Sequence, residues 1–269
     1  MIGIEPLVYF LVGSVGGLIV ASWHGYKDPP WENFIPTRWP RSIIMAGIIG
    51  LILFYLINAG LLNAVDNLGI ITLSAISLER FVAEIKKGFL RKTIHSEFKD
   101  VFVTYKIPIY YHSALVRILM GLVIFVGVLM VMIFYLKLPD YLIKFQINKI
   151  FLGALLGFIG GLSSAIAGAW KDSPSEGFLI KKFIRSIIAG PVGGIIMAYF
   201  SNSWQLFIIA GMGFERISVE FYKTFWTKSV RGMFKGKKPK YPEWFKKRWI
   251  FFMTYSTGVF VLALLLIFS

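Results

Sequence analysis

The segment Gly13–Gly50 reads GSVGGLIVASWHGYKDPPWENFIPTRWPRSIIMAGIIG, and the segment Gly157–Gly194 reads GFIGGLSSAIAGAWKDSPSEGFLIKKFIRSIIAGPVGG. The two segments align without a gap at a shift of 144 residues, and 15 of their 38 positions are identical. Unrelated segments of ordinary composition would share about three identities. Self-similarity at a fixed shift is typical of duplicated structural units. The alignment therefore predicts two copies of one unit.

A second block of the chain aligns at a shift of 136 residues, so the second copy is eight residues shorter. This block pairs Glu79-Arg80 with Glu215-Arg216 and continues for about 20 residues. The eight missing residues fall around Asn58–Leu68, where a loop would tolerate them. We expect a first repeat at residues 1–136, an outer linker at 137–149 and a second repeat at 150–269.

The composition of the chain is that of an integral membrane protein. Hydrophobic residues make up 57 % of the 269 residues and charged residues only 16 %, whereas a soluble domain is about a quarter charged. The mean hydropathy is +0.69. The chain has no Cys, which excludes disulfides, Cys-ligated metals and a Cys nucleophile.

Apolar stretches near the 20 residues that a membrane helix needs recur along both copies. Six candidate spans are Leu7–Trp23, Ser42–Leu62, Ser113–Leu136, Ile150–Ala169, Ser186–Phe200 and Trp249–Phe268. Two shorter candidates, Leu68–Leu78 and Trp204–Phe214, each run into a Glu-Arg pair. If the short segments cross the membrane, the chain has eight spans in parallel repeats; if they only dip in, it has six spans in inverted repeats.

The distribution of Lys and Arg favours eight spans, because cytoplasmic loops concentrate these residues. The eight-span arrangement divides the 29 basic residues 26 to 3 between the two sides, and the six-span arrangement divides them 17 to 12. We therefore predict an all-α integral membrane protein with about eight transmembrane helices. They form two parallel four-helix repeats, and the third helix of each repeat is short. The predicted location is the cell membrane, with both termini outside and the charged loops in the cytoplasm.

The whole net charge of +15 lies in the predicted inner segments. Bases interleaved with aromatic residues suit the headgroup level of a membrane. We expect anionic lipid headgroups to bind Lys235, Lys237, Lys238 and Lys240, each base adding about 1 kcal/mol. The same arms could instead dock a partner membrane complex. Nucleic acid is not an expected partner, because nothing resembles a folded reading head.

One polar motif is kept in both copies. It consists of Asp28, Glu32 and Arg41 in the first copy and Asp172, Glu176 and Arg185 in the second. The prolines between the acids suit a short interfacial helix capped by the Asp. Alternatively, these acids and arginines converge in a cytoplasmic vestibule that binds an ion or a phosphate.

The pairs Glu79-Arg80 and Glu215-Arg216 each follow 11 apolar residues. A helix of that length rises roughly 16 Å, about half of the hydrocarbon core. Ionisable groups at that depth are candidate functional residues. We expect each Arg to have an acid four residues on as its neighbour, and Arg41 and Arg185, or Lys27 and Lys171, to approach the glutamates. A purely structural charge network is the alternative.

Small residues recur three and four apart in the first span of each copy, at Gly13, Gly16, Gly17, Gly157, Gly160 and Gly161. Such spacing permits close helix crossing, and the alternative is that backbone carbonyls beside these glycines line a path. No sequence motif of an enzyme is present, and no catalytic residue, metal site or cofactor is predicted.

These observations favour a transport protein, either a passive ion channel or a uniporter, with its path at the repeat or subunit interface. We expect either a homo-oligomer or a partner membrane complex. Two alternatives stay open. One is a non-catalytic membrane subunit that docks a partner through its basic arms, and the other is a divalent-dependent enzyme acting on a lipid phosphate.

Overall fold

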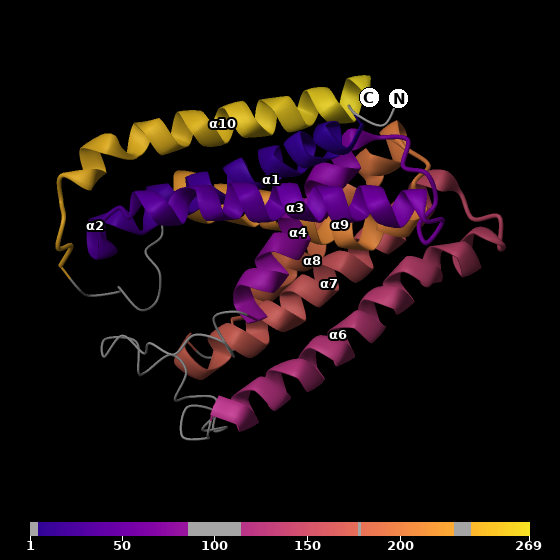
Figure 1. Cartoon of the computed structure of the whole chain (residues 1–269), viewed down its shortest axis with the longest axis horizontal. Helices are drawn as coiled ribbons and strands as arrows, with labels where there is room; N and C mark the ends of the chain where they lie inside the picture. The colour runs from indigo at the N-terminus through magenta and orange to yellow at the C-terminus, as the bar shows by residue number, and fades with distance from the viewer. Residues whose placement is uncertain (1–4, 86–113, 177–178, 229–237) are drawn as a thin grey trace.

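The computed structural model describes residues 5–85, 114–176, 179–228 and 238–269 (Figure 1). The described part of the chain is helical. Its nine α-helices are α1 (Glu5–Lys27), α2 (Pro29–Glu32), α3 (Trp39–Asn58), α4 (Leu68–Ile85), α6 (Ala114–Ile143), α7 (Lys149–Glu176), α8 (Ile180–Phe200), α9 (Phe207–Phe221) and α10 (Trp244–Phe268). Three short turns join them: the 3₁₀ turns η1 (Pro36–Arg38) and η5 (Trp204–Leu206), and the π-helical turn η6 (Tyr222–Trp226).

Five helices in these ranges are long and apolar enough to cross a membrane. They are α1, α3, α8, α10 and the Lys149–Ala169 part of α7. The predicted long apolar helices are thus confirmed for these segments. As expected, α4 and α9 are shorter, with 18 and 15 residues.

Two helices continue beyond the apolar stretches that predicted them. Helix α6 runs on through residues 137–143, which we expected to belong to the outer linker, and includes Pro139. Helix α7 runs on to Glu176, where we expected a separate capped helix. The extension of α7 is mostly polar, and the extension of α6 contains Pro139 near the end of the helix. Proline has no N–H, but so close to the end of an already formed helix this costs only one hydrogen bond.

The long helices run between two ends of the molecule (Figure 1). Helices α1, α4, α7 and α9 begin at the end that carries the loops 59–67, 144–148 and 201–203, and α3, α6, α8 and α10 finish there. The start of α1 and the end of α10 lie near each other at that end (Figure 1). At the opposite end, Asp28 precedes the short helix α2, Glu32 is its last residue, and α10 begins after Glu243.

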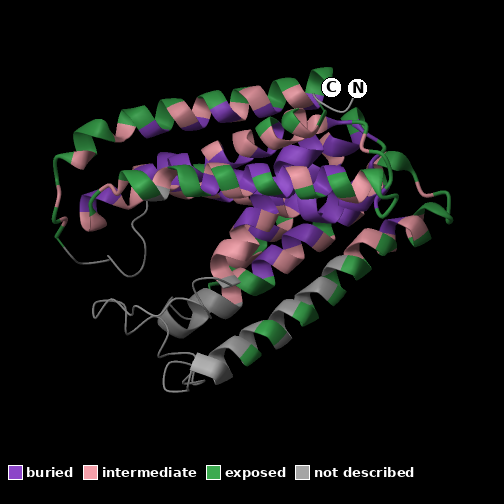
Figure 2. Ribbon diagram, in the orientation of Figure 1, coloured by how far each residue is buried: buried purple, intermediate pink, exposed green. Residues whose placement is uncertain are grey.

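The core lies between α4 and α9, which pack against each other at the centre of the bundle. Figure 2 shows the buried residues gathered in these central helices, whereas α10 and α3 present exposed residues outward. Ile70, Ile71 and Leu73 on α4 and Ile208 and Ala210 on α9 have no exposed surface. A Cβ at Gly213 of α9 would collide with the backbone of α4 at Leu73, so a small residue is needed where the two helices cross.

Pairs of long helices flank this core, with α1 on α3 and α10, and α7 on α8. Helix α6 stands apart and contacts the rest mainly through its last turns (Figure 1). Its described side chains are largely apolar and exposed, including Leu119, Leu122 and Met130. In a membrane such a surface faces lipid or another protein, since neither requires polar groups.

Candidate functional site

Two buried glutamates form the centre of the candidate site. Glu79 is 2 % exposed and Glu215 is 1 % exposed, although each lies beside an arginine in the sequence. An ionised carboxylate is stable away from water only when it is paired and hydrogen-bonded. The groups that satisfy these carboxylates therefore define the site.

Glu79 on α4 is held by α3 and by its own neighbour. Ser42 Oγ donates to Glu79 Oε1 over 2.8 Å, and Arg80 Nε donates to Glu79 Oε2 over 2.6 Å. Arg80 Nη2 also donates to Glu79 Oε1 at 3.0 Å. The expectation that Arg41 or Lys27 would approach Glu79 is wrong, because Arg41 is exposed and Lys27 binds elsewhere.

Glu215 on α9 repeats this arrangement with the residues that align in sequence. Ser186 Oγ on α8 donates to Glu215 Oε1 over 2.6 Å. Arg216 Nε lies 3.6 Å from Glu215 Oε2, within ion-pair distance but too long for a strong hydrogen bond. Serine is short enough to fit between closely packed helices, and its hydroxyl can donate to either carboxylate oxygen.

Glycines bring the serines into position. A Cβ at Gly17 would collide with the backbone at Ser42, and a Cβ at Gly161 would collide with the backbone at Ser186. Gly13 and Gly157 lie equally close to the next turn of α3 and α8, and Gly16 and Gly160 lie against the backbones of α4 and α9. The predicted small-residue faces are therefore helix-packing surfaces. They set how close each serine lies to its glutamate.

A second ion pair joins the two halves of the molecule. Lys27 Nζ at the end of α1 donates to Glu220 Oε2 on α9 over 2.5 Å, and the two side chains are 12 % and 15 % exposed. Thr224 Oγ1 donates to the same oxygen over 3.3 Å. Lys27 and Glu220 align with Lys171 and Glu84 in the other copy. The side chain of Lys171 lies outside the described residues.

His24 extends the network around Glu79, which the sequence did not suggest. Arg80 Nη1 lies 2.6 Å from His24 Nε2, and His24 Nδ1 lies 3.4 Å from Asp28 Oδ2. Arginine can only donate, so His24 Nε2 accepts and the ring proton is assigned to Nδ1, facing Asp28. Asp28 makes no side-chain cap of α2. The predicted Asp cap is therefore wrong, because this carboxylate faces the histidine.

Other predicted residues are arranged less closely. Arg185 lies on α8 with its guanidinium carbon 5.6 Å from the centre of the Tyr222 ring, and Glu32 is partly buried at the end of α2. The side chains of Asp172 and Glu176 lie outside the described residues. Of the predicted headgroup-binding lysines, Lys238 and Lys240 are exposed, and Lys235 and Lys237 lie outside the described residues.

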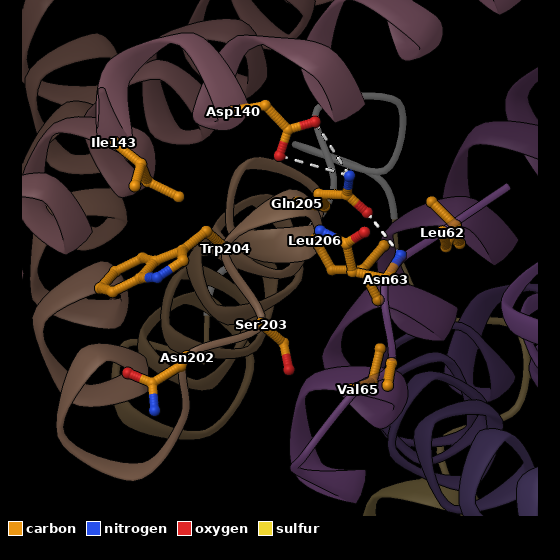
Figure 3. Close-up of a pocket in the computed structure, with 11 residues that line it drawn as sticks. Leu62, Asn63, Val65, Asp140, Ile143, Asn202, Ser203, Trp204, Gln205 and Leu206 are labelled. Atoms are coloured by element: carbon orange, nitrogen blue, oxygen red, sulfur yellow. Dashed lines mark hydrogen bonds between the residues drawn. The ribbon is translucent and has the colours of Figure 1, made fainter. Parts of the chain in front are cut away.

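A polar cavity at the opposite end was not predicted. It has a volume of about 50 Å³ and is lined by residues of the loops after α3 and α8 and of the end of α6 (Figure 3). Gln205 Nε2 donates to Asp140 Oδ2 over 3.0 Å, and Gln205 Oε1 accepts from the Asn63 N–H over 2.8 Å. The cavity has room for only a few water molecules. Asn63, Asp140 and Gln205 lie outside the two aligned blocks of sequence, so the alignment did not point to them.

Asp66 fastens the same two loops beside this cavity. Its carboxylate accepts from the hydroxyls of Ser201 and Ser203 and from the Asn202 N–H. Burial alone would raise the pKa of Asp66. The three hydrogen bonds favour the ionised form more strongly and hold the pKa below its usual range.

The chemistry available around Glu79 and Glu215 is electrostatic. Within the described ranges, no group of three or more His, Asp or Glu side chains could hold a metal ion. The glutamates are bound by serines and arginines.

No family model matches the chain, and no curated protein or solved structure matches it either.

Proposed function

We propose that this protein is a passive membrane transport protein, either a channel or a uniporter, built from two parallel four-helix repeats. Matching contacts in the two halves support the repeats. Gly17 lies against Ser42 as Gly161 lies against Ser186, and each serine donates to a buried glutamate. Similar contacts at aligned positions are expected when both halves descend from one folding unit.

The direction of the helices supports parallel rather than inverted repeats. The first and third helices of each half start at the same end of the molecule (Figure 1), so a rotation about an axis along the bundle relates the halves. The end where 26 of the 29 basic residues fall in the sequence then faces the cytoplasm. In this proposal α4, α6 and α9 also cross the cell membrane, and both termini lie outside.

The burial of Glu79 and Glu215 is the observation that carries the transport proposal. Both carboxylates lie on the two central helices, α4 and α9, among apolar helices. Charged groups in membrane spans are costly, and they usually mark a path or binding site for ions or polar substrates. Two such groups, at aligned positions on the two helices that pack against each other, are best explained by a substrate that passes both.

The path we propose follows the seam between α4 and α9. Glu79, Glu215 and the groups bound to them occupy its inner part. The outer part is filled by apolar side chains such as Ile70, Leu73 and Ile208. An ion cannot cross such a packed segment, so this proposal requires a second, open arrangement of the helices. Opening requires α4 and α9 to separate around the small residue at Gly213.

Current across a planar bilayer containing the purified protein tests this proposal. A double variant, Glu79→Gln with Glu215→Gln, keeps the shape and removes both charges. The matched control is Glu243→Gln, which makes the same change at an exposed glutamate outside the cluster. We expect conductance in the wild type and the control, and altered ion preference or at least a tenfold loss in the double variant.

Silence of all three proteins across anions, cations and voltages would contradict the channel form of the proposal. The exposed Lys238 and Lys240 near the start of α10 would then favour a membrane subunit that docks a partner. A stoichiometric partner that co-purifies in mild detergent would support that reading. Activity on a lipid phosphate that depends on a divalent ion and is lost in Asp28→Asn would instead support an enzyme.

A further inference from the structure

Arg248 is the last charged residue of the chain. It lies in the second turn of α10, and residues 249–269 carry no charge. Helix α10 is long and apolar enough to cross a membrane, so Arg248 marks the boundary between its polar start and its apolar part. Tyr26 and Trp31 lie beside it, and such side chains gather at the headgroup level of membranes. When α10 crosses a membrane, the Arg248 side chain therefore lies at that level.

Aromatic rings from three helices surround the Arg248 guanidinium. Its central carbon lies 4.5 Å from the centre of the Phe245 ring and 4.7 Å from that of Tyr26. The Trp31 ring is 5.8 Å away and packs edge-on against Phe245. The rings belong to α10, α1 and α2. The guanidinium therefore sits where these three helices meet, and the attraction between a cation and an aromatic face holds it there.

The start of α10 is fixed against the segment around α2. The Tyr241 N–H donates to the Pro30 carbonyl oxygen over 2.9 Å. Trp244 Nε1 donates to Asn33 Oδ1 over 3.0 Å, a bond between residues 211 positions apart. These bonds keep the aromatic rings in place, so the guanidinium is ordered before any ligand binds. A site that is already ordered loses less conformational freedom on binding.

Arg248 has no acidic partner among the described residues. No carboxylate in that part of the chain lies within ion-pair distance of it. Its Nε is buried without a hydrogen-bond acceptor, while the side chain as a whole is partly exposed. Aromatic faces accept only weak hydrogen bonds. At the headgroup level, the strong acceptors for a forked guanidinium are the phosphate oxygens of lipids.

Exposed apolar side chains continue along α10 from Arg248. Trp249 is 65 % exposed, and Met253, one turn further on, is 56 % exposed. Phe252 is also exposed and stands four residues after Arg248, on the same face of the helix. A lipid whose phosphate meets the arginine therefore finds an apolar surface for its acyl chains directly beside it.

We propose that Arg248 binds the phosphate group of one anionic glycerophospholipid, in the leaflet at the end of the bundle that carries α2. Residues 228–248 contain nine Lys and Arg and a single acid, Glu243, so their charge disfavours the choline of a zwitterionic lipid. The site differs from the general attraction of exposed bases for a membrane, because it depends on one ordered guanidinium. It goes beyond the proposed function, since it needs α10 in a membrane but no transport.

Native mass spectrometry of protein released from nanodiscs tests the inference. In nanodiscs of equal parts phosphatidylcholine and phosphatidylglycerol, the wild type should retain one phosphatidylglycerol and little phosphatidylcholine. Arg248→Gln should reduce the retained lipid about tenfold, because it removes charge-assisted hydrogen bonds. The matched control is Lys246→Gln. It removes the same charge from an exposed side chain two residues earlier, on another side of the helix, and should change little.

Two further variants separate the ordered guanidinium from its charge. Arg248→Lys keeps the charge and loses the planar fork of donors. Phe245→Leu keeps every charge and removes one of the rings that hold the guanidinium. Each should reduce the retained phosphatidylglycerol several-fold. Retention at the wild-type level in both variants would show that charge alone attracts the lipid, which contradicts an ordered site.

Inorganic phosphate in large excess distinguishes a lipid headgroup from free phosphate. It should leave the retained lipid in place, because free phosphate has no acyl chains to bind beside Trp249 and Phe252. Displacement of the lipid would contradict a lipid site and assign Arg248 to soluble phosphate.

Equal retention by wild type and Arg248→Gln would overturn the inference, provided that circular dichroism shows intact helices. An equal loss in Arg248→Gln and Lys246→Gln would overturn it as well. Because lipid retention is measured without flux, this inference and the proposed function fail separately.

Discussion

Lys27 on α1 and Glu220 on α9 form a partly buried ion pair 2.5 Å long between residues 193 positions apart in the chain. The pair connects the two halves of the protein at the end of the bundle opposite the loops 59–67 and 201–203. Since both side chains are at most 15 % exposed, neither charge can be satisfied by bulk water when its partner is removed.

Removing one member of this pair should therefore destabilise the protein more than removing both. We expect Lys27→Met to lower the free energy of unfolding by about 3 kcal/mol, and Lys27→Met with Glu220→Met to recover part of the loss. Chemical unfolding in detergent micelles measures the double-mutant cycle. Strictly additive effects of the two substitutions would show that the pair is not coupled.

The serines that hold the buried glutamates should matter in both halves. Ser186→Ala removes the hydrogen bond to Glu215 Oε1, and Ser42→Ala removes one of the two hydrogen bonds to Glu79 Oε1, leaving the one from Arg80. We expect Ser186→Ala to cost about 1–3 kcal/mol and Ser42→Ala to lie at the lower end of this range. Ser14→Ala is a matched control, because the Ser14 hydroxyl is buried with no hydrogen-bond partner among the described residues. Thermal unfolding of the three variants measures the effect. A loss in the control as large as in the other two would contradict the role given to the serines.

The close approach of α7 and α8 at Gly161 can be tested within one helix. Gly161→Ala places a Cβ against the backbone of Ser186, whereas a Cβ at Gly168, seven residues further along α7, would meet nothing within 4 Å. We expect Gly161→Ala to destabilise by roughly 1–3 kcal/mol through overpacking and Gly168→Ala to be neutral or slightly stabilising. Thermal unfolding of the two variants side by side decides the point. Equal stability would mean that the helices are not in close contact at Gly161.

Asp66 should make the loops 59–67 and 201–203 sensitive to acid. Its pKa is lower in the folded protein than in the unfolded chain, so it stabilises the fold above its unfolded pKa, about 3.9. That contribution is lost as the pH falls through the lower, folded value. Asp66 is exposed, and solvent screening limits its contribution to about 0.5–1 kcal/mol.

The variant Asp66→Asn should therefore unfold at lower temperature than wild type at pH 7. The difference between the two proteins should shrink below pH 4. Melting curves between pH 3 and pH 7 give the comparison, with Glu243→Gln as the exposed control. A constant difference over the whole range would exclude the titration of Asp66 as its cause.

The sequence predicted the helices well where apolar length decides them. The apolar run before Glu79 predicted a helix carrying charge deep among its neighbours, and this side chain is 2 % exposed. The pattern of glycines at Gly13 and Gly17 likewise predicted close helix crossing, which the backbone contacts confirm.

The partners of the charged groups could not be predicted in the same way. Helix spacing correctly placed Glu84 within electrostatic reach of Arg80. It did not predict that Arg80 also binds adjacent Glu79 and contacts His24, because contacts between helices depend on their relative rotation. Lys27 binds Glu220 in the other half for the same reason. The cavity at Gln205 and Asp140 is lined by residues outside the two aligned blocks of sequence, so the alignment did not point to it.

The proposed function requires ions or charged solutes to cross the membrane past Glu79 and Glu215. Flux into proteoliposomes measures this crossing, and it also detects a uniporter too slow to give a measurable current. Wild type, Glu243→Gln and the double variant Glu79→Gln with Glu215→Gln should be compared over cations, chloride and phosphate. We expect protein-dependent flux of at least one solute in wild type and control, reduced at least tenfold or altered in selectivity in the double variant. Flux no greater than that of protein-free vesicles, or flux that is identical in all three proteins, would contradict transport past these two glutamates.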